Sequence, residues 1–217
     1  MDWAMKFLPM QYRGQMSDFF GKRERSWHIS AVIIYQGRIG KEGNKFEVKC
    51  CVHLFNSCTQ NSFAVLFVIE NLLQTIKVEY PRVDKAFFCS DNAGCYHNGP
   101  LLVSLPELGV ITGVRPIWYD FCDPQAGKDI CDRKAAPMKA HIRRWVNEKH
   151  NVTTAQEMKE ALESHGGLKE CRAAEVEVDT SKQDSGDQYS KQLPFRRHWH
   201  EGMEGLQYWS RTPNTLR

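Results

Sequence analysis

The chain has 217 residues, of which 41% are hydrophobic and 25% are charged, a composition typical of a globular protein. This length is enough for one substantial domain with an appendage. The net charge of +3 is small, so it allows a nucleic-acid partner without indicating one. No segment is long and apolar enough to span a membrane, and the acidic start of the chain does not resemble a secretory signal. We therefore expect an intracellular protein with no membrane partner.

Eight cysteines are many for an intracellular chain. None of them forms a CxxC pair, and several lie within apolar runs, where a free cysteine behaves as a small hydrophobic residue. Cys89, Cys95 and His97 could contribute to a zinc site, but their spacing matches no standard structural zinc motif. We favour the structural role for the cysteines and a turn at His97, because Asn98-Gly99-Pro100 follows it.

The first third of the chain predicts strands. Residues 2–8 alternate, with Asp2, Ala4, Lys6 and Leu8 on one face and the residues between them on the other. Residues 27–35 and 45–55 are the next two strands, and a glycine-bearing loop over 36–44 joins them. Three strands with short connections favour an antiparallel meander.

Helices and strands then alternate. The pattern predicts a helix over 62–78 that Ser62 caps, a strand over 83–89 that is buried on both faces, a helix over 101–108, a strand over 114–121 and a helix over 130–147. This order is that of an α/β protein with a ribonuclease H-like mixed five-stranded sheet flanked by helices. We assign this core to residues 1–150. A small extension follows over 151–179, with a polar helix over 155–164 that Thr153 caps and a strand over 172–179. A flexible linker over 180–192 and an aromatic, basic tail over 193–217 come next.

Three aspartates stand where such a fold could bring them together. Asp2 lies in the first strand, Asp91 follows a buried strand at its carboxyl end, and Asp132 lies at the start of a helix. Open α/β sheets bind ligands beyond the carboxyl ends of their strands. Carboxylates are the ligands that Mg²⁺ prefers, and two such ions can catalyse phosphodiester chemistry. The structural alternative is that Asp91 caps the next helix and Asp132 merely begins another.

Four segments resemble transposon-derived eukaryotic proteins that have a ribonuclease H-like, integrase-superfamily transposase domain. They are Asp-Trp-Ala-Met-Lys-Phe-Leu-Pro over residues 2–9, Trp-His-Ile-Ser over 27–30, Ser-Asp-Asn-Ala-Gly-Cys-Tyr-His over 90–97 and Gly-Lys-Asp-Ile-Cys-Asp over 127–132. The likeness covers roughly residues 1–150. It implies a DDE/D-type triad of metal-binding catalytic acids, which falls on Asp2, Asp91 and Asp132, with Asp129 as a rival for the third place.

The resemblance implies divalent-metal-dependent cleavage or strand transfer of DNA, with Mg²⁺ or Mn²⁺ as the cofactor and a nuclear location. It leaves a homo-oligomer open. The alternative is a catalytically inactive transposon-derived fragment that only binds nucleic acid or a protein. A zinc-stabilised interaction module built on the cysteines is a third alternative.

Basic residues near Asp132 are candidate phosphate contacts. Lys128 precedes it, and Lys139 and Arg143 share its face if a helix runs continuously from Asp132. Met138, Ile142 and Val146 form the adjacent apolar stripe, which we expect to face the core. The alternative is an ordinary solvated face. Pro137 either lies inside that helix or marks its first turn, and only the first arrangement preserves the shared face.

Overall fold

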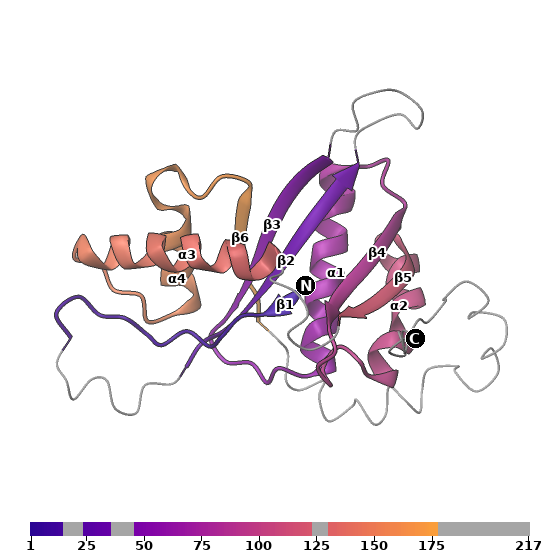
Figure 1. The fold of residues 1–217 in the computed structure, drawn as a ribbon, viewed down its shortest axis with the longest axis horizontal. Helices are drawn as coiled ribbons and strands as arrows, with labels where there is room; N and C mark the ends of the chain where they lie inside the picture. Colours follow the sequence, from indigo (N-terminus) through magenta and orange to yellow (C-terminus); the bar gives the residue numbers. More distant parts are fainter. Residues whose placement is uncertain (15–23, 36–45, 123–129, 178–217) are drawn as a thin grey trace, which may run out of the picture. The chain divides into compact units, whose positions relative to one another are not determined.

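The computed structural model describes residues 1–14, 24–35, 46–122 and 130–177 (Figure 1). The chain divides into two compact units. Unit 1 comprises Met1–Thr59 and Lys128–Val178, and unit 2 comprises Gln60–Gly127 together with Asp179–Arg217. Each unit contains its own sheet and helices. The linker and tail expected over 180–217 lie outside the described residues.

A mixed four-stranded sheet forms the centre of unit 1. Its strands are β1 (Asp2–Trp3), β2 (Ser26–Tyr35), β3 (Phe46–Phe55) and β6 (Cys171–Glu175), in the order β1-β2-β3-β6. The first three strands pair antiparallel, which confirms the predicted meander, and β6 pairs parallel to β3. The strand expected in the C-terminal extension therefore forms, and it belongs to the same sheet as the first three strands.

The helices α3 (Ile130–Asn147) and α4 (Ala155–Glu163) pack against one face of this sheet (Figure 1). On α3, the predicted stripe of Met138, Ile142 and Val146 is buried. It packs on a row of strand residues that includes Ile29 of β2 and its partner Val52 of β3. The spacing of this stripe matches the helical period, and burial of each such side chain contributes about 1.5–3 kcal/mol. Pro137 lies inside α3, so the helix is continuous from before Asp132.

The first strand is shorter than the predicted 2–8. The chain leaves the ladder after Trp3 and forms one more bridge at Phe7, opposite Arg25 just before β2. The register has advanced by one residue between the two points. One extra residue in a strand moves every later side chain to the opposite face of the sheet. Phe7 therefore enters the core on the same face as Ala4, whereas Met5 is exposed. The prediction that side chains alternate strictly between the two faces over residues 2–8 was therefore wrong.

A row of aromatic side chains lies on the opposite face of the sheet. Trp3 pairs with His28 across β1 and β2, and His28 pairs with His53 across β2 and β3. The rings of Trp3 and His28 meet edge to face at 5.0 Å between centroids, and both histidines are buried. Burial lowers the pKa of His28 well below its usual value, and the nearby His53 lowers it further.

Helix α4 begins at a capping box. The Thr154 hydroxyl accepts a hydrogen bond from the Glu157 backbone N–H at 3.1 Å, and the Glu157 carboxylate accepts one from the Thr154 N–H at 3.1 Å. The cap is thus one residue after the predicted Thr153, whose hydroxyl also donates to Glu157. Burial raises the pKa of Glu157, but the hydrogen bonds from Thr153 and Thr154 outweigh it and lower the pKa overall. Asn56, just after β3, accepts a hydrogen bond from the Ala155 N–H and so fixes the helix start to the sheet.

Unit 2 consists of α1 (Ser62–Glu79), β4 (Lys85–Asp91), α2 (Gly99–Thr112) and β5 (Arg115–Cys122). The strands β4 and β5 pair in parallel, with α2 as the crossover between them. Asn61 rather than Ser62 caps α1, because its side-chain oxygen accepts from the Ala64 N–H at 3.0 Å. The strand β4 alternates between exposed Phe87 and buried Phe88, so the expectation of burial on both faces was wrong.

Helix α2 packs closely on β5. A Cβ atom added at Gly109 would lie 2.9 Å from Cδ of Pro116, so only glycine allows this approach. Gly113 ends the helix with a φ of 69°, a left-handed conformation in which its N–H bonds to the Gly109 carbonyl. The predicted helix over 101–108 therefore extends to residues 99–112.

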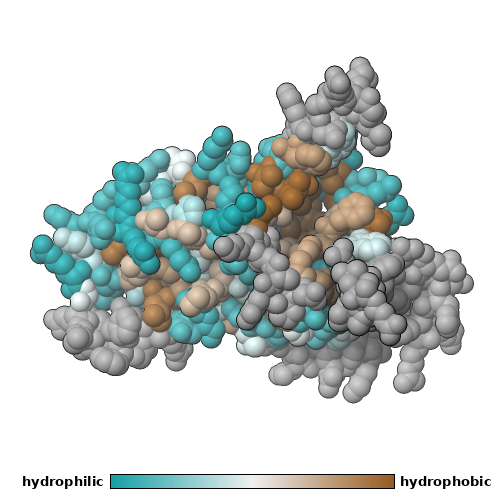
Figure 2. Space-filling view, viewed as in Figure 1, coloured by the Kyte–Doolittle hydropathy of each residue, from teal (hydrophilic) through white to brown (hydrophobic). Residues whose placement is uncertain are grey.

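The α/β class is confirmed, with one mixed four-stranded sheet and one two-stranded sheet. In unit 1, exposed apolar side chains gather over the ends of β2 and β3, where Ile33, Tyr35 and Phe46 are exposed, and polar side chains cover much of the surface over α3 (Figure 2). None of the helices in the described residues has the length and apolar character needed to cross a membrane.

The buried His28 gives a pH test of unit 1. Because its pKa is lowered in the folded state, the unfolded chain binds more protons, and the free energy of unfolding falls as the pH drops below about 6.5. One such group contributes a slope of up to about 1.4 kcal/mol per pH unit. We expect His28→Leu to have a shallower slope between about pH 7 and 5 in urea denaturation. Parallel curves for the two proteins would contradict the assignment.

The capping box gives a stability test of α4. Thr154→Ala removes the hydroxyl that satisfies the Glu157 N–H, so we expect the free energy of unfolding to fall by about 1 kcal/mol. Gln156→Ala in the same first turn is the matched control, since Gln156 is exposed and its amide bonds only to Glu160 in the next turn. Equal losses in both variants by urea denaturation would show that the cap contributes nothing.

Candidate functional site

The register of β1 determines which way Asp2 faces. Asp2 is the partner of Ile29, which in turn pairs with Val52, and Val52 pairs with Ala173 on β6. Directly opposed residues in a sheet lie on the same face. Ile29, Val52 and Ala173 belong to the core beneath α3 and α4, so Asp2 lies on the helix-covered face at the end of that row.

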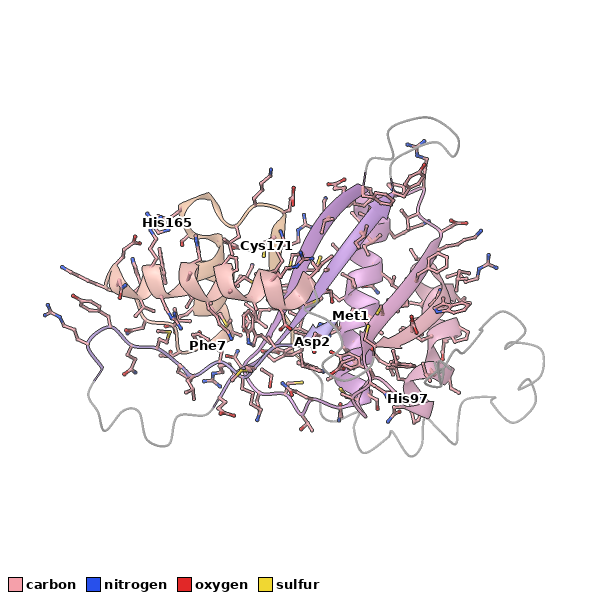
Figure 3. The ribbon with its side chains drawn as sticks, in the orientation of Figure 1. Met1, Asp2, Phe7, His97, His165 and Cys171 are labelled. Carbon is pink, nitrogen blue, oxygen red and sulfur yellow. The ribbon has the colours of Figure 1, made fainter. Side chains whose placement is uncertain are left out.

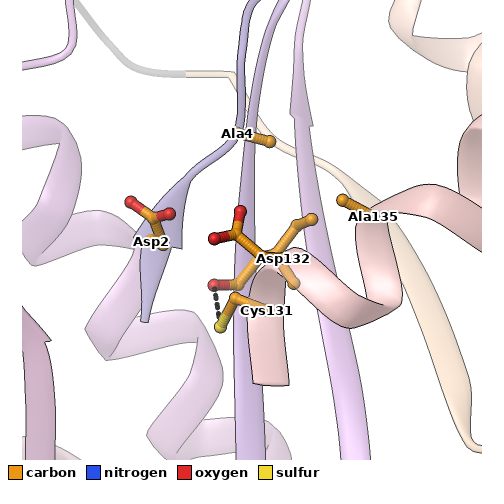
Figure 4. Close-up of a pocket in the computed structure, with 6 residues that line it drawn as sticks. Asp2, Ala4, Cys131, Asp132 and Ala135 are labelled. Atoms are coloured by element: carbon orange, nitrogen blue, oxygen red, sulfur yellow. Dashed lines mark hydrogen bonds between the residues drawn. The ribbon is translucent and has the colours of Figure 1, made fainter. Parts of the chain in front are cut away.

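Asp132 reaches the same place from the helix. It lies in the first turn of α3, one residue after Cys131, which is buried. The two aspartates line one small pocket, as Figure 4 shows, with Ala4, Ile29, Cys131 and Ala135 as the other lining residues. Unit 1 therefore brings together two of the three predicted acids, although they are far apart in the sequence. Asp2 is half-buried and Asp132 is exposed.

The pocket offers oxygen ligands on an otherwise apolar lining. Cys131 brings a sulfur to the lining, but its thiol donates to the backbone carbonyl of Ile29 at 3.5 Å (Figure 4). The carboxylates of Asp2 and Asp132 are therefore the donors directed at this site. Hard oxygen ligands of this kind suit Mg²⁺ or Mn²⁺ and suit softer ions less well. The N-terminus of α3 also favours negative charge at Asp132.

Asp91 belongs to unit 2. It is the last residue of β4, at the carboxyl end as predicted, and its partner on β5 is Cys122. Its side chain is exposed, and it accepts a hydrogen bond from the Ala93 N–H at 3.4 Å. Asn98 caps the following helix, so the structural alternative of Asp91 as a helix cap was wrong. Asp132 does begin a helix, as its alternative proposed.

The candidate phosphate contacts have different surroundings. Arg143 is exposed on α3, and the continuous helix places it on the face of Asp132. Lys139 is half-buried, and its ammonium lies 6.0 Å from the ring centroid of Trp27, at the limit of a cation–π contact. Lys128 and the rival acid Asp129 lie outside the described residues.

Cys89, Cys95 and His97 do not assemble a zinc site. Throughout the described ranges, no three His, Cys, Asp or Glu side chains gather closely enough to hold a metal ion. Cys89 instead lies beside Cys122, with 3.2 Å between the sulfurs, and burial raises the pKa of Cys89 to about 12. His97 hydrogen bonds to Asn92 at 2.6 Å and stacks on Phe121.

Sequence reasoning missed a second thiol pair, Cys50 and Cys171. They are direct partners in the parallel ladder of β3 and β6, and their thiols hydrogen bond. No local pattern could reveal this, because the pairing depends on a register between strands that are remote in the sequence.

The fold and the pocket define an α/β protein with a two-carboxylate site in unit 1. A family model described as a domain of unknown function, DUF8701, matches residues 1–201, so the chain belongs to this family. No curated protein and no solved structure matches the chain. The family carries no assigned function, so the site must be interpreted from its own chemistry.

The pocket predicts a direct effect of divalent cations on stability. Mg²⁺ or Mn²⁺ bound between Asp2 and Asp132 stabilises the folded chain by about 1.4 kcal/mol when the ion is roughly tenfold above its Kd. We expect a corresponding rise in Tm for the native sequence and none for Asp132→Asn. Asp84→Asn is the matched control, since Asp84 is exposed in unit 2 before β4. If the rise in Tm is lost in both Asp132→Asn and Asp84→Asn, or in neither, the pocket is not the cation site.

Proposed function

We propose that this protein is a transposase- or integrase-like enzyme that cleaves or joins DNA phosphodiester bonds with the help of a divalent metal. The single observation that carries the proposal is the shared pocket of Asp2 and Asp132 (Figure 3 labels Asp2 at the start of β1). The two carboxylates supply oxygen ligands to one pocket, and such ligands are the ones that Mg²⁺ prefers.

The aspartates have distinct roles in this proposal. Asp2, on the row of strand partners, is the more firmly oriented carboxylate and would bridge two ions. Asp132 would complete the shell of one ion and Asp91 that of the other. When bound, a Mg²⁺ or Mn²⁺ pair activates the attacking water or hydroxyl and stabilises the leaving oxygen. The carboxylates would hold the ions in place and would favour hard cations over softer ones.

Asp91 can act as the third metal-binding acid only in the ribonuclease H-like sheet that the resemblance implies. Three antiparallel strands in unit 1 and two parallel strands with a helical crossover in unit 2 are the elements of a ribonuclease H-like five-stranded sheet. We propose a ribonuclease H-like five-stranded sheet for the active protein, with Asp91 as the third acid. Asp129 remains the rival to Asp132.

DNA is the proposed substrate because of the charge on α3. Arg143 presents a cation on the face of Asp132, and Lys139 lies between them along the helix. Cations beside metal-binding carboxylates are suited to a phosphate backbone. Lys128 is the third proposed contact. A DNA substrate implies a nuclear location, and self-association of the chain stays open.

The second candidate is a catalytically inactive, transposon-derived protein that only binds nucleic acid or a protein partner. The observation that favours it is that the basic face of α3 lies wholly within unit 1 and needs no third carboxylate. Binding without cleavage would then be the whole activity.

Nicking of supercoiled DNA in Mg²⁺ or Mn²⁺ separates the candidates. We expect nicking by the native sequence, and a loss of about 10²-fold or more in Asp2→Asn, Asp91→Ala and Asp132→Asn, because each removes a ligand of the proposed ions. Asp84→Asn is the matched control and should nick normally. Equal nicking by all variants would defeat the enzymatic proposal, as would its absence from the native protein.

A binding assay tests the second candidate, a protein that binds nucleic acid without cleaving it. Fluorescence anisotropy with a DNA duplex should show weaker binding by Arg143→Ala and a smaller dependence on salt, since one phosphate contact is lost. Binding that depends on Arg143 without any nicking would support the second candidate. Native binding equal to that of the variant, at every salt concentration, would remove α3 from the interface.

A further inference from the structure

Unit 1 contains a pair of thiols whose placement indicates chemistry of their own. Cys50 and Cys171 are direct partners in the parallel ladder of β3 and β6, so their side chains emerge on the same face of the sheet. The backbones are fastened at this point, because the Cys50 N–H donates to the Glu170 carbonyl at 2.7 Å. Cys50 is buried in the core, whereas Cys171 is partly exposed on the outermost strand (Figure 3).

The surroundings of the two thiols shift their pKa values in opposite directions. A hydrogen bond from Cys50 lowers the pKa of Cys171, burial opposes this, and the Lys134 ammonium lowers it further. The same hydrogen bond raises the pKa of Cys50, and burial adds to that effect. Lys134 is held nearby by Glu170, the neighbour of Cys171, at 3.9 Å. A partly exposed thiol with a lowered pKa near a cation, with a buried thiol of raised pKa behind it, is the arrangement of an oxidant-reactive cysteine and its resolving partner.

We propose that Cys171 and Cys50 form a redox-active pair in which Cys171 reacts with hydrogen peroxide and Cys50 converts the product to a disulfide. In the first step the Cys171 thiolate attacks one peroxide oxygen. An S–O bond forms, the O–O bond breaks, and hydroxide leaves, which gives a sulfenic acid. This hydroxide takes up the proton that the Cys171 thiol released, which gives the first water. In the second step the Cys50 sulfur attacks the Cys171 sulfur. The S–S bond forms, the S–O bond breaks, and the departing hydroxide takes the Cys50 proton. Two thiols and one peroxide thus yield one disulfide and two waters.

Two other thiol arrangements compete with this pair. Cys131 lies near Cys50, but its thiol donates to the Ile29 carbonyl. Cys89 and Cys122 have sulfurs 3.2 Å apart, but Cys89 stands opposite Asp120 rather than opposite Cys122. Diagonal positions on neighbouring strands are about 7–8 Å apart between Cα atoms, which is beyond the usual disulfide span. These pairs are therefore internal comparisons for the experiment.

The experiment treats the full chain with hydrogen peroxide and dimedone, then maps its cysteines by non-reducing peptide mass spectrometry. We expect a Cys50–Cys171 disulfide in the native sequence, a dimedone adduct at Cys171 in Cys50→Ser, and neither in Cys171→Ser. The double variant Cys89→Ser with Cys122→Ser is the matched control and should form the Cys50–Cys171 bond normally. A dominant Cys89–Cys122 or Cys50–Cys131 bond, or no adduct at Cys171 in Cys50→Ser, would overturn the proposal.

A second measurement needs no substitution of Cys50 or Cys171. Iodoacetamide should alkylate Cys171 of the native protein at least about tenfold faster than Cys58 at pH 7, because only thiolates react. Cys58 is a suitable comparison, since it is also partly exposed and burial raises its pKa to about 11. Lys134→Met should slow the alkylation of Cys171 and leave that of Cys58 unchanged. Equal rates at the two cysteines, or no response to Lys134→Met, would overturn the assignment. None of these readouts depends on DNA cleavage.

Discussion

The register of β1 on β2 is the constraint on which the candidate site depends. Asp2 opposite Ile29 places the carboxylate on the face that α3 covers, whereas Trp3 opposite His28 places the indole on the other face. A shift of one residue would exchange the two, because side chains alternate strictly along a strand. The Ala4 N–H bonds to the Trp27 carbonyl, and the Trp27 indole N–H bonds to the Met5 carbonyl at 2.7 Å. These contacts hold the short strand at one register.

Features with a local cause could be predicted from the sequence. The spacing of Met138, Ile142 and Val146 on α3 identified both the helix and its buried face. Helix starts were displaced by one residue at Asn61 and Thr154, because each has a neighbour that can also cap. The pairing of β6 with β3 could not be predicted, since nothing near residue 171 specifies a partner so remote in the chain.

The same distinction applies to the candidate site. Asp2 and Asp132 share a pocket, as their positions in a first strand and at a helix start suggested. The extra residue near Met5 was missed because an alternating sequence pattern does not show where strand pairing is interrupted. The environment of Lys139 was also missed, because contact with the Trp27 ring is a property of packing between α3 and β2. Asp91 ends its strand as expected, but it belongs to another unit.

Unit 1 is built from two separated stretches of the chain, and the helices and strands of unit 2 lie between them in the sequence. Parallel pairing of β3 with β6 can form only after the ribosome has made all the intervening residues. The helices and strands of unit 2 are contiguous and can fold first. Until residues 130–163 have emerged, the apolar face of the unfinished meander lacks the cover of α3 and α4. This nascent state is the stage of biosynthesis at which a chaperone would have most to protect.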